Sequence, residues 1–150
     1  MTKIDTIDHR ILRVLSEEAR ISNIDLADRV GLSPSACLRR VQTLERIGII
    51  RGYRAVLDGT LLGRGFVAYI TVGLNDHTTE AQKAFEREIS RAPEVIECHN
   101  ITGAVEYLLR VEVSDLATYK TFHAETLGRL SQVSALTTFV VMASPKDLRG

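Results

Sequence analysis

The chain has 150 residues, of which 45% are hydrophobic and 25% are charged, and its 19 Lys and Arg equal its 19 Asp and Glu in number. This composition is typical of a folded globular protein and excludes a disordered chain. No apolar run approaches the roughly 20 residues of a membrane span, and no signal-peptide pattern opens the chain, so we expect a cytoplasmic protein without membrane contacts. Cys37 and Cys98 have no metal-like spacing, and we expect neither a metal nor a cofactor.

The balanced net charge hides an uneven distribution along the chain. Residues 1–60 carry 10 Lys and Arg against 8 Asp and Glu, whereas residues 61–150 carry 9 against 11. Within residues 29–54, six arginines accompany a single acid, Glu45. Contact with nucleic-acid phosphates requires positive charge close by, because charges beyond about 10 Å are screened at 0.1 M salt. The pattern therefore indicates a DNA-binding patch, and the alternative is an ordinary solvated helix face.

The first part of the chain predicts three helices, at about 5–18, 23–30 and 34–47. In the first helix, isoleucine, valine and leucine recur at helical spacing, and Asp5 is placed to cap its N-terminus. The short connection between the second and third helices requires them to cross steeply. Such a helix-turn-helix lets its second helix lie in a DNA major groove.

Start and stop signals support this helix-turn-helix. Ser22 can cap the second helix, with Asp25 placed to complete a capping box, and Gly31 suits the left-handed conformation that ends it. Ser33 caps the third helix and is followed by a proline in its first turn, and Gly48 ends that helix. The third helix is therefore the predicted recognition helix.

The predicted recognition helix has an apolar inner stripe of Cys37, Val41 and Leu44 and a polar outer stripe. Hydroxyls, amides and guanidinium groups are the side chains that contact phosphates and base edges. In this helix and its cap, we predict DNA contacts from Ser33, Ser35, Ala36, Arg39, Arg40, Gln42, Thr43 and Arg46. For Arg40 the alternative is an ion pair with an acid on another helix, such as Asp28.

Residues 49–57 follow the recognition helix and are polar at alternate positions, which favours a strand pair or wing. Arg51 and Arg54 would reach flanking phosphates from this wing. Asp58-Gly59 and the nearby glycines at 63 and 65 indicate a linker. We therefore divide the chain into a DNA-binding domain at 1–60 and a second domain at 61–150.

The second domain predicts the order strand, helix, strand, strand, helix, strand. The expected elements are strands from Phe66 to Leu74 and at 95–102, 107–113 and 134–142, with helices at about 81–89 and 116–130. This βαββαβ order is the ferredoxin-like pattern, in which helices cover one face of the sheet. Apolar residues on the other face would favour a homodimer formed through the sheet. The candidates for that face are Tyr69, Tyr107, Phe139 and Val141.

The order of motifs resembles the leucine-responsive/asparagine-activator (Lrp/AsnC) family of feast/famine regulators, and the resemblance covers nearly the whole chain. In the first half the matching residues are Leu26-Ala27, Val30-Gly31-Leu32-Ser33-Pro34-Ser35, Arg40-Val41, Leu44, Gly48-Ile49-Ile50, Gly52-Tyr53 and Leu57-Asp58. In the second half they are Ala92-Pro93-Glu94-Val95, Ile101-Thr102-Gly103 and Tyr107-Leu108-Leu109-Arg110-Val111.

The resemblance implies an α+β fold, with an N-terminal winged helix-turn-helix and a C-terminal domain of the amino-acid-metabolism regulator type. It also implies dimers that assemble further, often into octamers, and an amino-acid effector bound between dimers near the loop at 103–107. Glycine at 103 allows a close approach to backbone amides, and Glu106 is placed to accept hydrogen bonds from an ammonium group. The predicted effector residues are Gly103, Ala104, Glu106 and Tyr107, together with Thr137 and Thr138 of the last strand as polar partners from an adjacent subunit.

The effector loop departs from the family pattern Gly-x-x-Asp-Tyr, because this chain has Glu106 in place of the aspartate. The longer carboxylate keeps the charge but reaches about one methylene further. The alternative interpretation makes Gly103 a hairpin turn and Glu106 a solvated strand end.

The main functional hypothesis is a sequence-specific, DNA-binding transcriptional regulator that responds to a small amino acid. Its partners would be double-stranded DNA and further copies of itself. A second hypothesis is a nucleoid-type protein that wraps DNA without an effector. An enzyme is not expected, since the sequence has no clustered nucleophile, base or metal ligands.

Overall fold

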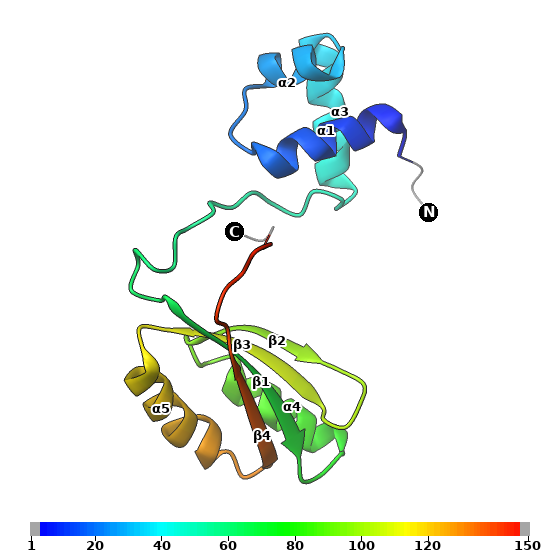
Figure 1. The fold of residues 1–150 in the computed structure, drawn as a ribbon. Helices are drawn as coiled ribbons and strands as arrows, with labels where there is room; N and C mark the ends of the chain where they lie inside the picture. The colour runs from blue at the N-terminus through cyan, green and yellow to red at the C-terminus, as the bar shows by residue number, and fades with distance from the viewer. Residues whose placement is uncertain (1–3, 148–150) are drawn as a thin grey trace. The chain divides into compact units, whose positions relative to one another are not determined.

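The computed structural model describes residues 4–147 and divides the chain into two compact units (Figure 1). The first unit ends at Ala55 and the second begins at Val56. This division and the predicted boundary at residue 60 both fall in the segment between the last helix of the first unit and the first strand of the second. Among the described residues, no helix is long and apolar enough to span a membrane.

The first unit consists of three helices, as predicted: α1 (Thr6–Glu17), α2 (Asn23–Val30) and α3 (Pro34–Arg46). Each begins at its predicted cap. The side chains of Asp5, Ser22 and Ser33 accept hydrogen bonds from backbone N–H groups of the first turns of α1, α2 and α3. A cap satisfies amides that have no partner inside the helix, and this fixes where each helix starts.

The helix ends also follow the sequence, with one correction to the capping box. Gly31 has a φ of 75° and ends α2 in the left-handed conformation that glycine accepts without strain. The predicted box at Ser22 is only half formed, because the Asp25 carboxylate accepts from the Ser22 hydroxyl at 2.6 Å. The reciprocal box is found at α1, where Asp5 and Asp8 accept from each other's backbone N–H.

The three helices enclose a small core of their own. Its buried members come from all three helices and are Ile11, Leu26, Ala27, Val30, Cys37 and Leu44. Cys37 and Leu44 belong to the inner stripe predicted for α3, and both are almost fully buried. This packing fixes which face of α3 remains exposed.

The predicted strand pair at 49–57 was wrong, because this segment contains no strand. Its first two amides, those of Ile49 and Ile50, both donate to the carbonyl of Leu44 and close the end of α3. The rest of the segment has no neighbouring strand within the described chain, and a strand without a partner has no hydrogen-bond ladder. The segment is therefore exposed and irregular.

The second unit has the predicted βαββαβ order. Its elements are β1 (Phe66–Leu74), α4 (Thr79–Ile89), β2 (Val95–Asn100), β3 (Tyr107–Val113), α5 (Leu116–Glu125), the short 3₁₀ helix η1 (Leu127–Arg129) and β4 (Val133–Val140). The sheet order is β2-β3-β1-β4, and every neighbouring pair is antiparallel. This is the ferredoxin-like topology.

Both helices of the second unit cover the same face of the sheet (Figure 1). Alternate residues of β1 and β3 point into this core, together with Phe85 of α4 and Phe122 of α5. Tyr107 belongs to the core and is 1% exposed, so its predicted place on the open face was wrong. Tyr107 shares the strand parity of Leu109, and the neighbouring leucine at 108 made both faces of β3 look equally apolar in the sequence.

Candidate DNA-binding surface and ligand loop

The outer face of α3 presents a stripe of exposed polar side chains. Ser35, Arg39, Gln42 and Arg46 are all exposed. Within residues 4–147, the side chains of Arg39, Gln42 and Arg46 form no hydrogen bond or ion pair. Their donors and acceptors are therefore available to an external partner, as the sequence predicted. Leu38 is also exposed here (46%) and was not predicted, although it lies on the same outer side of the helix.

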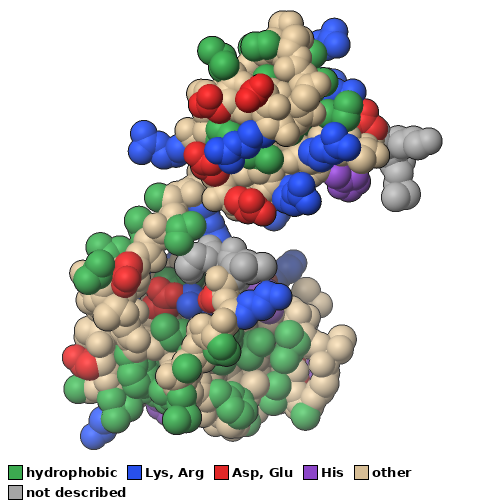
Figure 2. Space-filling model, turned by 45° about the horizontal axis from the view of Figure 1, so that its top comes forward, with side chains coloured by type: hydrophobic (Ala, Val, Ile, Leu, Met, Phe, Trp, Pro, Cys, Tyr) green, Lys and Arg blue, Asp and Glu red, His purple; other side chains and the backbone are tan. Residues whose placement is uncertain are grey.

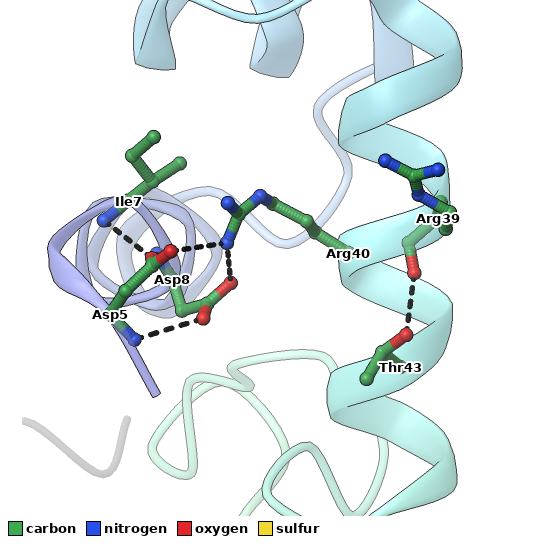
Figure 3. A network of polar contacts seen from close by, with 6 residues as sticks. All are labelled: Asp5, Ile7, Asp8, Arg39, Arg40 and Thr43. Atoms are coloured by element: carbon green, nitrogen blue, oxygen red, sulfur yellow. Dashed lines mark hydrogen bonds and ion pairs between the residues drawn. The ribbon is translucent and has the colours of Figure 1, made fainter. Parts of the chain in front are cut away.

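Arg40 points away from this face and towards α1 (Figure 3). Its Nη1 atom lies 2.8 Å from Asp5 Oδ2 and 2.8 Å from Asp8 Oδ1. The pairing interpretation of Arg40 is thus confirmed, but with Asp5 and Asp8 rather than Asp28 as partners. The backbone N–H of Asp8 and the guanidinium of Arg40 lower the pKa of Asp5. Arg40 therefore joins the recognition helix to α1, and its contact with DNA stays a prediction.

The remaining predicted residues of α3 have local structural contacts. The Ser33 hydroxyl accepts from the N–H of Ala36 at 3.3 Å and lies 3.3 Å from the hydroxyl of Ser35. The Thr43 hydroxyl donates to the carbonyl of Arg39 at 2.9 Å (Figure 3). Ala36 and Thr43 are half-buried. These residues shape the helix and its start, whereas the exposed outer stripe carries the unpaired groups.

Two contacts that the sequence did not predict fix α2 within the unit. The Asn23 amide donates to the carbonyl of Pro34 at 2.8 Å, and Arg29 forms an ion pair with Glu18 at 2.8 Å. The spacing of residues in the sequence predicts neither contact, because each contact joins residues of different elements. Figure 2 shows Lys and Arg side chains, with acids among them, over the visible surface of the helical unit. Arg51 and Arg54 lie beyond α3 and are exposed.

The loop between β2 and β3 is tied to β1 through Glu106. The Glu106 amide donates to the carbonyl of Val72, and one carboxylate oxygen accepts from the N–H of Leu74 at 2.7 Å. The other oxygen lies 2.7 Å from His77 Nδ1. The Leu74 N–H, assisted by His77, lowers the pKa of Glu106. The carboxylate predicted to receive a ligand ammonium therefore already has two partners within the chain.

The predicted effector residues lie at this loop and, as the sequence indicated for Thr137 and Thr138, on β4. Gly103 has a φ of 145°, and a Cβ added there would meet no atom within 4 Å. Thr138 lies on the helix-covered side, where its hydroxyl is 2.5 Å from that of Tyr119, whereas Thr137 is exposed. The structure thus places Thr137 and Thr138 apart, because neighbouring residues of a strand point to opposite faces.

Tyr107 is also turned away from the loop surface. Its hydroxyl donates to Glu86 of α4 at 2.7 Å, and its ring packs against Phe85. Burial and the neighbouring Glu86 raise the pKa of Tyr107 to about 12. Tyr107 therefore packs in the core between β3 and α4, and its contact with an effector stays a prediction.

Two family models and a set of curated relatives match this arrangement. Residues 4–51 match a winged helix-turn-helix DNA-binding model, and residues 67–150 match the Lrp/AsnC ligand binding domain. The leucine-responsive regulatory protein of Escherichia coli is 39% identical over 144 residues, which cover 96% of this chain and 88% of that protein. The chain belongs to the Lrp/AsnC family.

Solved structures of Lrp/AsnC regulators share both units of the fold. A transcriptional regulator of Neisseria meningitidis, solved as a complex with L-Met, superposes with a TM-score of 0.93 and is 34% identical, with 97% of this chain and 94% of that chain covered. An AsnC family regulator of Agrobacterium tumefaciens gives a TM-score of 0.91 at 33% identity, with 96% and 94% covered. The protein is therefore an Lrp/AsnC transcriptional regulator with a DNA-binding and a ligand-binding domain, and not an enzyme.

Proposed function

We propose that this Lrp/AsnC regulator reads a specific DNA sequence with the outer face of α3 and responds to a small amino acid. The observation that carries the proposal is that Arg39, Gln42 and Arg46 lie on an exposed helix face and have no side-chain partner within residues 4–147. Guanidinium and amide groups are the side chains that read guanine and adenine in the major groove. The ion pairs of Arg40 support DNA recognition by holding α3 against α1 at a fixed position.

The proposed base contact is tested by replacing Arg39 with Ala and measuring affinity for a selected operator and for random DNA of equal length. A good bidentate contact contributes roughly 1–3 kcal/mol of discrimination. The expected result is therefore about a tenfold or greater loss on the operator, with a much smaller loss on random DNA. An equal loss on both would reduce Arg39 to a phosphate contact. Arg13→Ala, on the exposed side of α1, provides the control.

We propose that two copies associate through the open face of the sheet. On this face Tyr69 lies between Arg110 and Phe139 in the strand register, and Phe139 is 56% exposed. Arg110 and Glu112 form an ion pair there, and the Arg110 Nε is buried without a hydrogen-bond partner. A second copy would cover the apolar residues and bring further acceptors to Arg110.

The proposed dimer is tested by measuring the solution mass of the protein and of Phe139→Asp. The expected wild-type mass is that of a dimer or of an assembly of dimers, and the charged substitution should shift it towards a monomer. A monomeric wild-type protein would contradict the proposal. Paired recognition helices then explain how two DNA half-sites are read together.

We propose that the ligand is a small amino acid that binds between dimers at the loop before β3. The support is the match of residues 67–150 to the family's ligand binding domain and the L-Met complex of the Neisseria regulator. A thermal-shift screen of the amino acids, with L-methionine as the first probe, tests this proposal. A shift with one or a few amino acids is expected, and no shift with any of them would favour a protein that wraps DNA without an effector.

A further inference from the structure

His77 contacts the carboxylate oxygen of Glu106 that does not accept from the backbone of β1. Its Nδ1 atom lies 2.7 Å from Glu106 Oε1, while Oε2 is held by the backbone N–H of Leu74. The Glu106 side chain is 16% exposed and also fixed through its own amide, which donates to Val72. The His77 side chain is 77% exposed. Glu106 is thus the fixed member of the pair and His77 the movable one.

We propose that His77 competes with the ammonium group of an amino-acid ligand for the carboxylate of Glu106. This inference rests on the proposed function, since it requires an amino acid at this loop. The Leu74 contact is a backbone hydrogen bond at the end of β1, whereas the His77 contact is a side-chain pair at the surface. A ligand ammonium would therefore replace His77 at Oε1 and leave the Leu74 contact in place.

The competition depends on pH because an imidazole gains its positive charge between about pH 8 and pH 5. A protonated His77 forms an ion pair with Glu106, and the ligand must break that pair. A neutral His77 offers only an uncharged hydrogen bond. The ligand ammonium itself stays protonated over this range. We therefore expect the affinity for the ligand to rise as the pH rises from 5.5 to 8.

The charged side chains nearest to His77 in the chain are carboxylates. Asp76, in the same turn as His77, accepts from the N–H of Thr78, and Glu80 lies in the first turn of α4. Towards β4, the turn is held by carbonyls of uncharged residues, since Asn75 donates to those of Ser131 and Gln132. Histidine is the side-chain class that gains a charge between pH 8 and pH 5.5, whereas carboxylates as a class remain largely ionised over this range.

The experiment measures the affinity of the full-length protein for L-methionine, or for the amino acid with the largest shift in the screen, by titration calorimetry at pH 5.5 and pH 8. The wild-type protein is compared with His77→Gln, which keeps a hydrogen-bonding side chain but has no charge. His9→Gln, an exposed histidine of α1, is the matched control. Surface ion pairs of this kind change an equilibrium by up to about fivefold.

The expected result is an affinity about three- to fivefold tighter at pH 8 than at pH 5.5 in the wild-type protein and in His9→Gln. In His77→Gln the affinity should be nearly equal at both pH values and close to the wild-type value at pH 8. Ligand binding by His77→Gln without detectable binding by the wild-type protein would also support the competition. An unchanged pH dependence in His77→Gln would overturn the inference and leave the proposed function intact. No binding by any variant at either pH would overturn the proposed ligand response itself.

Discussion

The outer face of α3 and the loop before β3 both carry the polar groups expected of a binding site, but they differ in how these groups are bonded. The side chains of Arg39 and Gln42 have no partner in the part of the chain that the structure describes, and they lie on a helix held by a packed core. Glu106 is bonded to Leu74 and His77 within the chain. The first surface is ready for a partner without internal change. At the second site a ligand must replace the contact between Glu106 and His77. Its affinity therefore depends on the free energy of that contact.

The largest effect is expected from breaking the core that presents the first surface. Leu44→Ala removes a side chain that is 2% exposed in α3, and such changes cost roughly 2–5 kcal/mol of unfolding free energy. Because the sheet unit has a separate core, its ligand response should survive while DNA binding is lost. Chemical denaturation together with ligand-induced thermal shifts measures both. Leu38→Ala, in the same helix but 46% exposed, is the matched control and should remain nearly as stable as the wild-type protein.

A smaller effect is expected from Arg40→Ala, which removes the ion pairs between α3 and α1 but leaves the outer face of α3 unchanged. The melting temperature of the helical unit should fall by a few degrees, because Asp5 and Asp8 lose their shared partner. Binding to operator and to random DNA should weaken by the same factor, unlike the selective loss expected for Arg39→Ala. Fluorescence anisotropy on both DNAs measures this. A selective loss in Arg40→Ala would mean that Arg40 leaves the acids and contacts a base.

The smallest effect is expected from Glu106→Gln, whose amide oxygen still accepts from Leu74 but carries no charge. The lowered pKa of Glu106 means that its charge stabilises the fold above about pH 4.3, the ordinary glutamate value, and that this stabilisation is lost as the pH falls below it. The variant should therefore melt slightly below the wild-type protein at pH 6, and the difference should shrink as the pH falls through the lowered pKa of Glu106. A difference that does not shrink with falling pH would show that the charge is not its cause.

Much of the fold followed from short stretches of sequence. The three caps of the helical unit and the bounds of its helices were predicted correctly, as was the order of the second unit. The outer stripe of α3 was also predicted, because helical spacing alone places Arg39, Gln42 and Arg46 opposite Cys37 and Leu44. The strand pair predicted at 49–57 was wrong, since the amides of Ile49 and Ile50 close the end of α3 instead of pairing with a neighbouring strand.

The sequence by itself determined where the helices begin and end and which face of α3 is polar, because a cap acts over three residues and a helix repeats every 3.6. Only the tertiary structure decided which polar groups on these elements are free. Arg40 lies beside Arg39 in the chain, yet it meets Asp5 and Asp8, 35 and 32 residues away. Glu106 likewise meets Leu74 and His77 from another strand and turn. Such pairs depend on how separate elements pack, and residue spacing carries no signal for that.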